Sequence, residues 1–352
     1  MTEVAAALFR DFAELEAKGV SPLYEQLARY VATRPSLRRL LGAAPPRQRR
    51  ATLFFAAIHD VVLEQGVGYP DDGPALEAFC AVNLEAITLR ISSRRTQTNE
   101  VARGAQLVPA MSIITGLAGQ PPSVLEVGAS AGLNLRFDDY RYTYRAGSRT
   151  ITLGDLGAPV QVEVDFEGDV AAIPAALPVI AERIGLDVEP VDLADPEQRR
   201  WLRACVWANE TGRDLRLQAA IERARRDPPV VIRGDAIADL GVVADRLSLD
   251  APLVVAHQVV MGYLSTRERD WFGLAVRSLA RRRPVYWLFA ESPTAAQTLA
   301  GVTPPSSGRV EHVLVLADLT RDPSAAIVLA TADPHGRWIR WVASVDERAD
   351  FA

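Results

Sequence analysis

The sequence predicts an α/β protein built on a doubly wound, mostly parallel sheet of seven strands. Two observations support this fold class. Between residues 123 and 291, short apolar strand patterns alternate with longer helix patterns. The first strand, SVLEVGA (123–129), leads into a run of small residues at a strand-to-helix turn. Such residues let the backbone approach a ligand closely, and the start of the next helix offers free N–H donors. In such sheets, ligands bind in a crevice at the carboxyl ends of the strands.

Residues 1–118 predict a helical N-terminal domain that serves as a cap or lid, and residues 119–352 predict the α/β domain. Apolar positions recur with helical spacing in VAAALFRDFAELEA, PLYEQLARYVA, ATLFFAAIHDVVLE and ALEAFCAVNLEAITLRI, which Pro- and Gly-containing turns separate. No convincing strand precedes Ser123. The chain is also longer than one average domain, which agrees with two parts.

The α/β part predicts further elements in a definite order. They are a short helix to about residue 139, an antiparallel hairpin insertion near 141–170, a helix at 178–184, a strand at 185–191, a helical stretch at 196–226, strands at 230–236 and 252–260, a helix at 266–282, and strands at 284–291, 311–319 and 326–334. Within the helical stretch, Trp201 and Trp207 have a spacing that favours core packing over an aromatic cage.

Composition excludes several classes of function. The net charge of −5 argues against nucleic-acid binding, because phosphate recognition requires a basic face. The 2 cysteines and 4 histidines are scattered, so we expect neither a disulfide framework nor a metal site. We find no apolar run long enough to span a bilayer and no signal-peptide pattern. We therefore expect a cytoplasmic protein, and its oligomeric state stays open.

Acidic residues lie at or near the carboxyl ends of the first three predicted strands. Glu126 stands within the first strand, just ahead of the small-residue turn, Asp187 belongs to the second strand, and Asp235 stands in the turn that ends the segment 230–236. The carboxyl ends of neighbouring parallel strands lie side by side, and carboxylates can accept ribose hydroxyls or an adenine amino group. This set predicts a site for a nucleoside-like ligand. As alternatives, Asp187 is a turn residue and Asp235 caps a helix.

The segment Glu126-Val-Gly128-Ala-Ser130-Ala-Gly132 is similar to the E-x-G-x-G-x-G turn of class I S-adenosylmethionine-dependent methyltransferases. The two C-terminal strands resemble the antiparallel hairpin that ends the methyltransferase sheet. More narrowly, QTNEVARGAQLVPA and LEVGASAGLNLRFDDYRY resemble the bacterial domain-of-unknown-function 2332 family over nearly the whole chain. The methyltransferase resemblance implies S-adenosylmethionine as cofactor, with Glu126 near its methionine part. The implied cofactor-binding residues are Glu126, Gly128, Ala129, Ser130, Gly132, Asp187, Gly234, Asp235 and Ala236.

Two features depart from that pattern. Ser130 replaces the middle glycine of the turn, which narrows the approach to the methionine part of the cofactor. Gly128 and Asp187 are 59 residues apart (187 − 128), against roughly 20 in a compact dinucleotide-binding unit. The hairpin insertion absorbs this excess if the second strand still lies beside the first.

Catalytic and substrate-binding candidates come from other segments. His257, at the end of the fourth parallel strand, is a candidate general base, or else a histidine that the backbone satisfies. Tyr263 lines the substrate pocket or packs in the core. A polar run precedes the apolar helix at about 101–117 and either caps that helix or folds over the crevice. The predicted substrate-binding residues are Gln97, Thr98, Asn99, Glu100, Asn134, Arg136 and Tyr140, with surface solvation as the alternative for the arginine.

Three functions stay open at this point. The first is an S-adenosylmethionine-dependent methyltransferase that acts on a small-molecule acceptor. The second is a non-catalytic or regulatory protein that binds an adenosyl ligand on a methyltransferase-like fold, since a fold does not dictate a function. The third is an enzyme that uses another adenosine-containing cofactor, such as a dinucleotide.

Overall fold

The computed structural model describes residues 2–304, 311–321 and 325–344. The chain forms two compact units: unit one comprises residues 1–98 and 194–218, and unit two comprises residues 99–193 and 219–352. This division differs from the predicted boundary after residue 118. Helix α7 (Gly104–Ala118) lies in unit two, and unit one gains a segment from much later in the chain.

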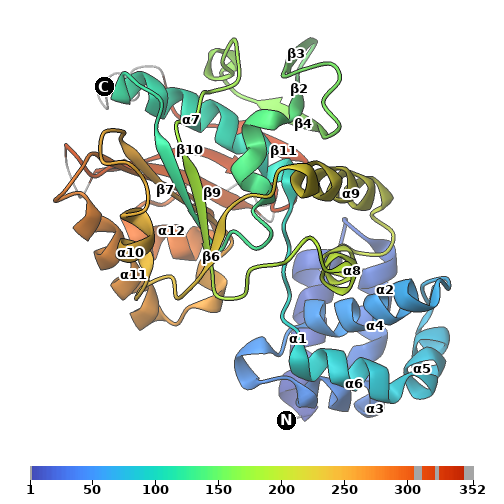
Figure 1. Cartoon of the computed structure of the whole chain (residues 1–352). Coiled ribbons are helices and arrows are strands. Elements are labelled where there is room, and N and C mark those ends of the chain that lie inside the picture. Colours follow the sequence, from blue (N-terminus) through green and yellow to red (C-terminus); the bar gives the residue numbers. More distant parts are fainter. Residues whose placement is uncertain (1, 305–310, 322–324, 345–352) are drawn as a thin grey trace. The chain divides into compact units, whose positions relative to one another are not determined.

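Unit one is helical, as the apolar periodicity of its first segment predicts (Figure 1). The helices are α1 (Thr2–Asp11), η1 (Phe12–Ala17), α2 (Pro22–Thr33), α3 (Pro35–Leu40), η2 (Leu41–Ala43), η3 (Pro46–Gln48), α4 (Ala51–Gln65), α5 (Gly73–Val82), α6 (Leu84–Ser93), α8 (Pro196–Ala204) and the first half of α9 (Thr211–Arg226). Local signals set several of their ends: the Ser21 hydroxyl accepts the amide of Tyr24 at the start of α2, and Gly66 ends α4 in a left-handed conformation.

An aromatic cluster forms part of the core of unit one. Tyr24 stacks on Trp207 with ring centroids 5.1 Å apart, and it stacks on Tyr69 at 5.8 Å. Trp201 and Trp207 are both buried in this core. The prediction that these two tryptophans pack in a core is therefore confirmed.

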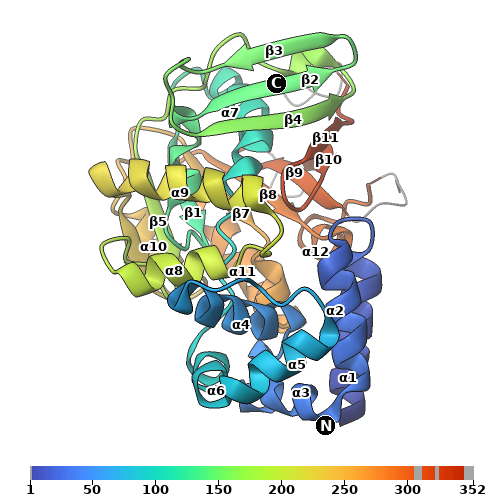
Figure 2. The ribbon, with the colours of Figure 1, turned by 90° about the vertical axis from the view of Figure 1, so that its right-hand side faces the viewer.

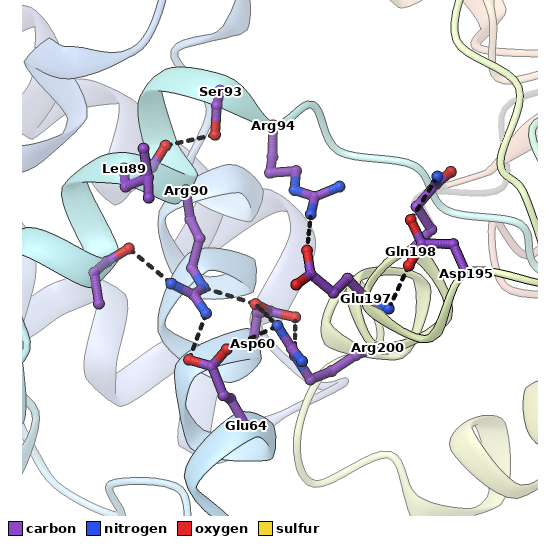
Figure 3. A network of polar contacts seen from close by, with 11 residues as sticks. Asp60, Glu64, Leu89, Arg90, Ser93, Arg94, Asp195, Glu197, Gln198 and Arg200 are labelled. Carbon is purple, nitrogen blue, oxygen red and sulfur yellow. Dashed lines mark hydrogen bonds and ion pairs between the residues drawn. The ribbon is translucent and has the colours of Figure 1, made fainter.

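Buried ion pairs join the two chain segments of unit one (Figure 3). Asp60 of α4 accepts hydrogen bonds from Arg90 Nε at 2.7 Å and from Arg200 Nε at 3.0 Å. Glu64, one turn further along α4, accepts from the Nη2 atoms of the same two arginines at 2.7 and 3.0 Å. Asp60 is only 3% exposed, so this network fastens α8 to α4 and α6 inside the unit.

Unit two contains a sheet of eleven strands among its described residues, with the order β3-β2-β4-β11-β10-β9-β8-β7-β1-β5-β6. The strands are β1 (Ser123–Val127), β2 (Arg141–Ala146), β3 (Arg149–Leu153), β4 (Gln161–Glu167), β5 (Arg183–Asp187), β6 (Val231–Arg233), β7 (Leu253–Gln258), β8 (Val285–Glu291), β9 (His312–Asp318), β10 (Ala326–Ala332) and β11 (Trp338–Trp341). The sheet is mixed and mostly parallel. The predicted number of seven strands is wrong, because β11 adds a strand beside β10, and β2, β3 and β4 extend the sheet further through a parallel pairing of β4 with β11 (Figure 2).

The parallel part of the sheet has the order β6-β5-β1-β7-β8. From β1 the chain proceeds outward to β5 and β6, and it then returns to place β7 on the other side of β1. This reversal is a topological switch point, where open α/β sheets bind their ligands. The predicted position of the second strand beside the first is confirmed, because Val127 is in register with Leu186 despite the long insertion.

Both faces of this part of the sheet are covered. Leu125 and Val255 point into a core with helices α10 (Leu240–Ala244), α11 (Thr266–Leu279) and α12 (Pro293–Ala300). Successive side chains of a strand point to opposite faces. Glu126 therefore faces the other side, where Leu107 and Met111 of α7 lie beside it.

Three expectations about local structure need correction. Residues 178–184 form no helix, and β5 begins within this segment at Arg183. The helical stretch at 196–226 is two helices, α8 and α9, with a break between them. One 18-residue window, Val101–Ala118, is apolar and long enough to cross a membrane by those two criteria alone, although 67% of it is buried. Such burial is typical of a core helix.

Candidate functional site

The small-residue turn between β1 and the next helix has an unusual backbone. Gly128 and Gly132 adopt φ values of +73° and +70°, and Ser130 between them adopts +55°. The helix that follows, η5 (Leu133–Asp139), is a 3₁₀ helix rather than an α-helix. The predicted strand-to-helix turn is therefore present in a tighter form.

The backbone amides of this turn all have partners within the protein. We expected free donors here, and that expectation is wrong. Two side chains provide acceptors: Asp187 Oδ2 accepts from Ser130 N at 2.7 Å, and Asn99 Oδ1 accepts from two further amides. The complete set of bonds is Gly128 N and Ala129 N to Leu186 O, Ser130 N to Asp187 Oδ2, Ala131 N and Leu133 N to Asn99 Oδ1, and Gly132 N to Ala129 O.

The space beside the two glycines is filled by other parts of the chain. A Cβ atom on Gly128 would lie 2.4 Å from Val260 Cγ2, and one on Gly132 would lie 2.7 Å from Pro229 Cγ. We expected these small residues to let a ligand approach the backbone. Instead, the positive φ values and the close packing of Val260 and Pro229 account for both glycines.

Asp187 and Asp235 follow neighbouring strands at the same edge of the sheet. The amide of Gly234 donates to the carbonyl of Asp187 at 2.9 Å, which joins the ends of β5 and β6. Asp187 Oδ1 also accepts from Glu189 N at 2.8 Å. Asp235 is exposed, and its Oδ1 accepts from the amides of the turn that follows, at 2.8 and 2.9 Å. Both aspartates thus cap turns, and the half-buried Ala236 lies within the second of these turns.

Glu126 is the unusual charged group of this region. Its side chain is 6% exposed, and its Oε2 atom has no hydrogen-bond partner. Burial, together with the nearby charge of Asp187, raises the pKa of Glu126 to about 8, and Arg103 opposes the shift. A buried carboxyl without full pairing costs free energy, which makes this group a functional-site candidate.

A small cavity of about 10 Å³ adjoins Glu126, close to the minimum volume for one water molecule. Asn134 of η5 also lines it, and the Oδ1 atom of this buried side chain has no partner either. Gln258 of β7 also lines the cavity, and its Oε1 atom accepts a hydrogen bond from Gln106 Nε2 at 2.7 Å. The cavity lies between α7, η5 and the ends of β1 and β7, and it lies entirely within unit two.

The predicted polar run at 97–100 divides between the two units. Asn99 belongs to unit two and holds the glycine turn, as described above. Glu100 caps the short helix η4 (Val101–Arg103) by accepting from Ala102 N at 3.1 Å. Gln97 and Thr98 belong to unit one, where the amide of Gln97 lies 3.5 Å from Cys205 Sγ.

Two other predicted substrate-binding residues make contacts inside unit two. Arg136 is 7% exposed and pairs with Asp139 Oδ2 at 2.9 Å and with Asp227 Oδ2 at 2.6 Å. Surface solvation, the alternative for this arginine, is therefore wrong. The Tyr140 hydroxyl donates to Leu133 O at 2.5 Å and thereby fastens the end of η5 to its start.

His257 lies on the opposite face of the sheet from Glu126, because Glu126 is in register with Ala256 and His257 follows. The imidazole is 0% exposed and stacks on Phe289 at 5.2 Å. Its Nδ1 atom lies 2.9 Å from Glu291 Oε1. The partner is thus a carboxylate and not the backbone, and the buried Nε2 atom has no hydrogen-bond partner, so the structure does not show the alternative of a histidine that the backbone satisfies. Tyr263, the other catalytic candidate, is 41% exposed and lies in the short helix η7 (Met261–Tyr263).

Backbone strain marks the same edge of the sheet. Among the described residues, Ser130 and Val259 are the non-glycine residues with positive φ, at +55° and +61°. They follow β1 and β7, the two strands that flank the switch point. Such strain gathers at ligand-binding and catalytic sites.

Sequence reasoning missed four residues of this region: Gln106, Gln258, Val260 and Glu291. A carboxylate at the end of β8 is a visible signal for Glu291, whereas the other three carry no recognisable motif. The structure groups no three His, Cys, Asp or Glu side chains as a metal site within the residues that it describes.

Comparison with known proteins places the chain among its relatives. No curated protein matches it. One family model matches residues 6–341, nearly the whole chain, and its description is "Uncharacterized protein conserved in bacteria (DUF2332)". The Asn99 segment and the glycine turn, which the structure joins by hydrogen bonds, both lie within the matched region. The chain therefore belongs to the DUF2332 family.

Proposed function

We propose that this protein is an S-adenosylmethionine-dependent methyltransferase that acts on a small-molecule acceptor. The ligand binds at the carboxyl edge of β1, β5 and β6. Three features support this edge of the sheet: the switch point between β1 and β7 adjoins it, the strained residues Ser130 and Val259 follow β1 and β7, and a small cavity lies beside Glu126 at the end of β1.

The observation that carries the proposal is the buried carboxyl of Glu126, which lies beside Asp187 and whose Oε2 atom has no hydrogen-bond partner. Two acids in a region of low dielectric repel each other, and a cationic ligand relieves this repulsion. S-adenosylmethionine carries a sulfonium and an ammonium group, and it supplies an electrophilic methyl group when bound. Glu126 and Asn134 would hold its methionine part, Asp187 its ribose, and Asp235 its adenine amino group.

The hydrogen bonds of the glycine turn limit which groups of the protein can bind a ligand. Because the turn amides already have partners, the contacts fall on side chains rather than on the backbone. A dinucleotide requires free backbone donors for its pyrophosphate. The same observation therefore argues against the dinucleotide alternative.

Isothermal titration calorimetry with S-adenosylmethionine and S-adenosylhomocysteine tests the proposal. We expect binding to the wild-type protein, at least tenfold weaker binding to Glu126→Gln and Asp187→Asn, and no change for Asp245→Asn. Asp245 is a matched control, because its carboxylate forms a surface ion pair with Arg282. Absence of heat and of a thermal shift would contradict the proposal, provided that mass spectrometry finds no adenosyl compound co-purified with the protein.

A second candidate function is the binding of an adenosyl ligand without turnover. The buried position of His257 favours it, because the imidazole of this candidate base packs among aromatic side chains on the face of the sheet opposite Glu126. Binding without methyl transfer to a broad panel of acceptors, together with full cellular function of His257→Ala, would support this second candidate.

A further inference from the structure

The turn that follows β7 is held by one carboxylate. Glu291, at the end of β8, accepts from Val260 N at 2.8 Å and from Met261 N at 3.3 Å through its Oε1 atom. The same oxygen lies 2.9 Å from His257 Nδ1. Glu291 is 2% exposed, so its bonds to the turn are shielded from water. We call residues 258–261 the β7 turn.

The β7 turn keeps a strained conformation. Val259 adopts a φ of +61°, which a β-branched residue rarely tolerates. The bonds from the next two amides to Glu291 hold this conformation. Such strain persists only while the surrounding structure imposes it, so release of the anchor would let the segment relax.

The strained turn places Val260 directly against Gly128. A Cβ atom at Gly128 would lie 2.4 Å from Val260 Cγ2, so the valine methyl fills that space. The cavity beside Glu126, which Gln258 of the β7 turn also lines, measures about 10 Å³, whereas small-molecule sites span roughly 300 Å³ or more. An adenosyl ligand therefore needs a wall of this region to move.

We propose that the β7 turn is the wall that moves, that Val260 is the residue that closes the ligand site beside Gly128, and that Glu291 is the positioning residue that holds the turn closed. This inference rests on the proposed function. The other segments around Gly128 are held by more bonds. β1 is paired with strands on both sides, and Asn99 and Asp187 accept hydrogen bonds from the turn after it. The β7 turn depends on Glu291 for two of its amides.

Hydrogen–deuterium exchange without ligand tests the anchor. Glu291→Gln keeps the side-chain size but weakens the charge-assisted bonds to two amides. We expect exchange at Val260 and Met261 to rise at least tenfold, while the amides of β1 stay protected. Unchanged exchange at these two amides would overturn the role of Glu291.

Titration with S-adenosylhomocysteine tests the closing residue. Val260→Ala removes methyl groups that the ligand must displace, so we expect affinity to rise about fivefold. Val260→Leu should lower affinity by a similar factor. Val328→Ala is the matched control, because Val328 is also half-buried against the same core. Equal affinities for the wild type and both Val260 variants would overturn the inference but leave the proposed function intact. No binding to any folded variant would overturn both.

Discussion

Replacing Glu126 by glutamine should stabilise the protein, and the gain should depend on pH. The pKa of this buried carboxyl is about 8 in the folded protein, against an ordinary value of 4.5. Below pH 4.5 the carboxyl is protonated in both the folded and the unfolded states. Between pH 4.5 and 8 the folded state holds a proton that the unfolded state has lost, so stability falls as pH rises. Above about pH 8 the penalty stays constant.

The size of this effect follows from the same two values. One pKa unit corresponds to about 1.4 kcal/mol, so the interval from 4.5 to about 8 corresponds to about 5 kcal/mol at most. Glutamine has nearly the same shape and carries no charge. We therefore expect Glu126→Gln to unfold with about 3–5 kcal/mol more free energy than the wild type at pH 8.5, and with little difference at pH 4.5.

Urea denaturation at a series of pH values measures this difference. Glu163→Gln is the control, because the Glu163 side chain on β4 is 63% exposed and should show no such dependence. A difference that does not change with pH would refute the reasoning. So would a variant that is less stable than the wild type at high pH, because the carboxylate would then be charged and well paired.

Four other outcomes are expected. Binding of S-adenosylmethionine should strengthen up to about tenfold per pH unit as pH rises towards 8, since a cationic ligand requires ionised Glu126, and Glu126→Gln should lose this dependence in calorimetric titrations. Asn99→Ala should cost about 2 kcal/mol in urea denaturation, because two turn amides lose their acceptor; an unchanged midpoint would contradict this role. Asp60→Asn should cost about 3 kcal/mol, because two arginines lose a buried partner, and wild-type stability would show that the network is dispensable. Gly128→Ala should cost at least about 2 kcal/mol through its positive φ and its overlap with Val260, which thermal unfolding would detect.

The parallel strands could be predicted well because each is a short, buried apolar run between turn residues. β1, β7 and β8 lie within about two residues of the predicted ranges. The prediction failed at residues 178–184, where apolar residues matched a helical spacing. Pro178 at the start of that segment is a turn signal that the pattern outweighed.

The extent of the sheet could not be predicted, because strand pairing across a long separation has no local signal. β4 pairs with β11 although about 170 residues separate them along the chain. For the same reason, the sequence could not predict that residues 194–218 join residues 1–98 in unit one. Asp60 meets Arg200 through an ion pair between distant segments, and nothing near either residue announces it.

The candidate site was predictable in its place but not in its contacts. The acids Glu126 and Asp187 were expected near the glycine turn, and the structure brings them there. The partners of the turn amides were not foreseen, because Asn99 acts from 32 residues upstream of Ala131. Glycine in the sequence signalled a close approach at position 128, but the approaching atoms belong to Val260 instead of a ligand.

A crystal structure of the protein grown with S-adenosylhomocysteine shows whether the ligand binds where we propose. We expect density for the adenosyl ligand at the ends of β1, β5 and β6, with its ribose on Asp187 and its amino-acid part beside Glu126. Density at another place, or an unaltered cavity under saturating ligand, would contradict this proposal.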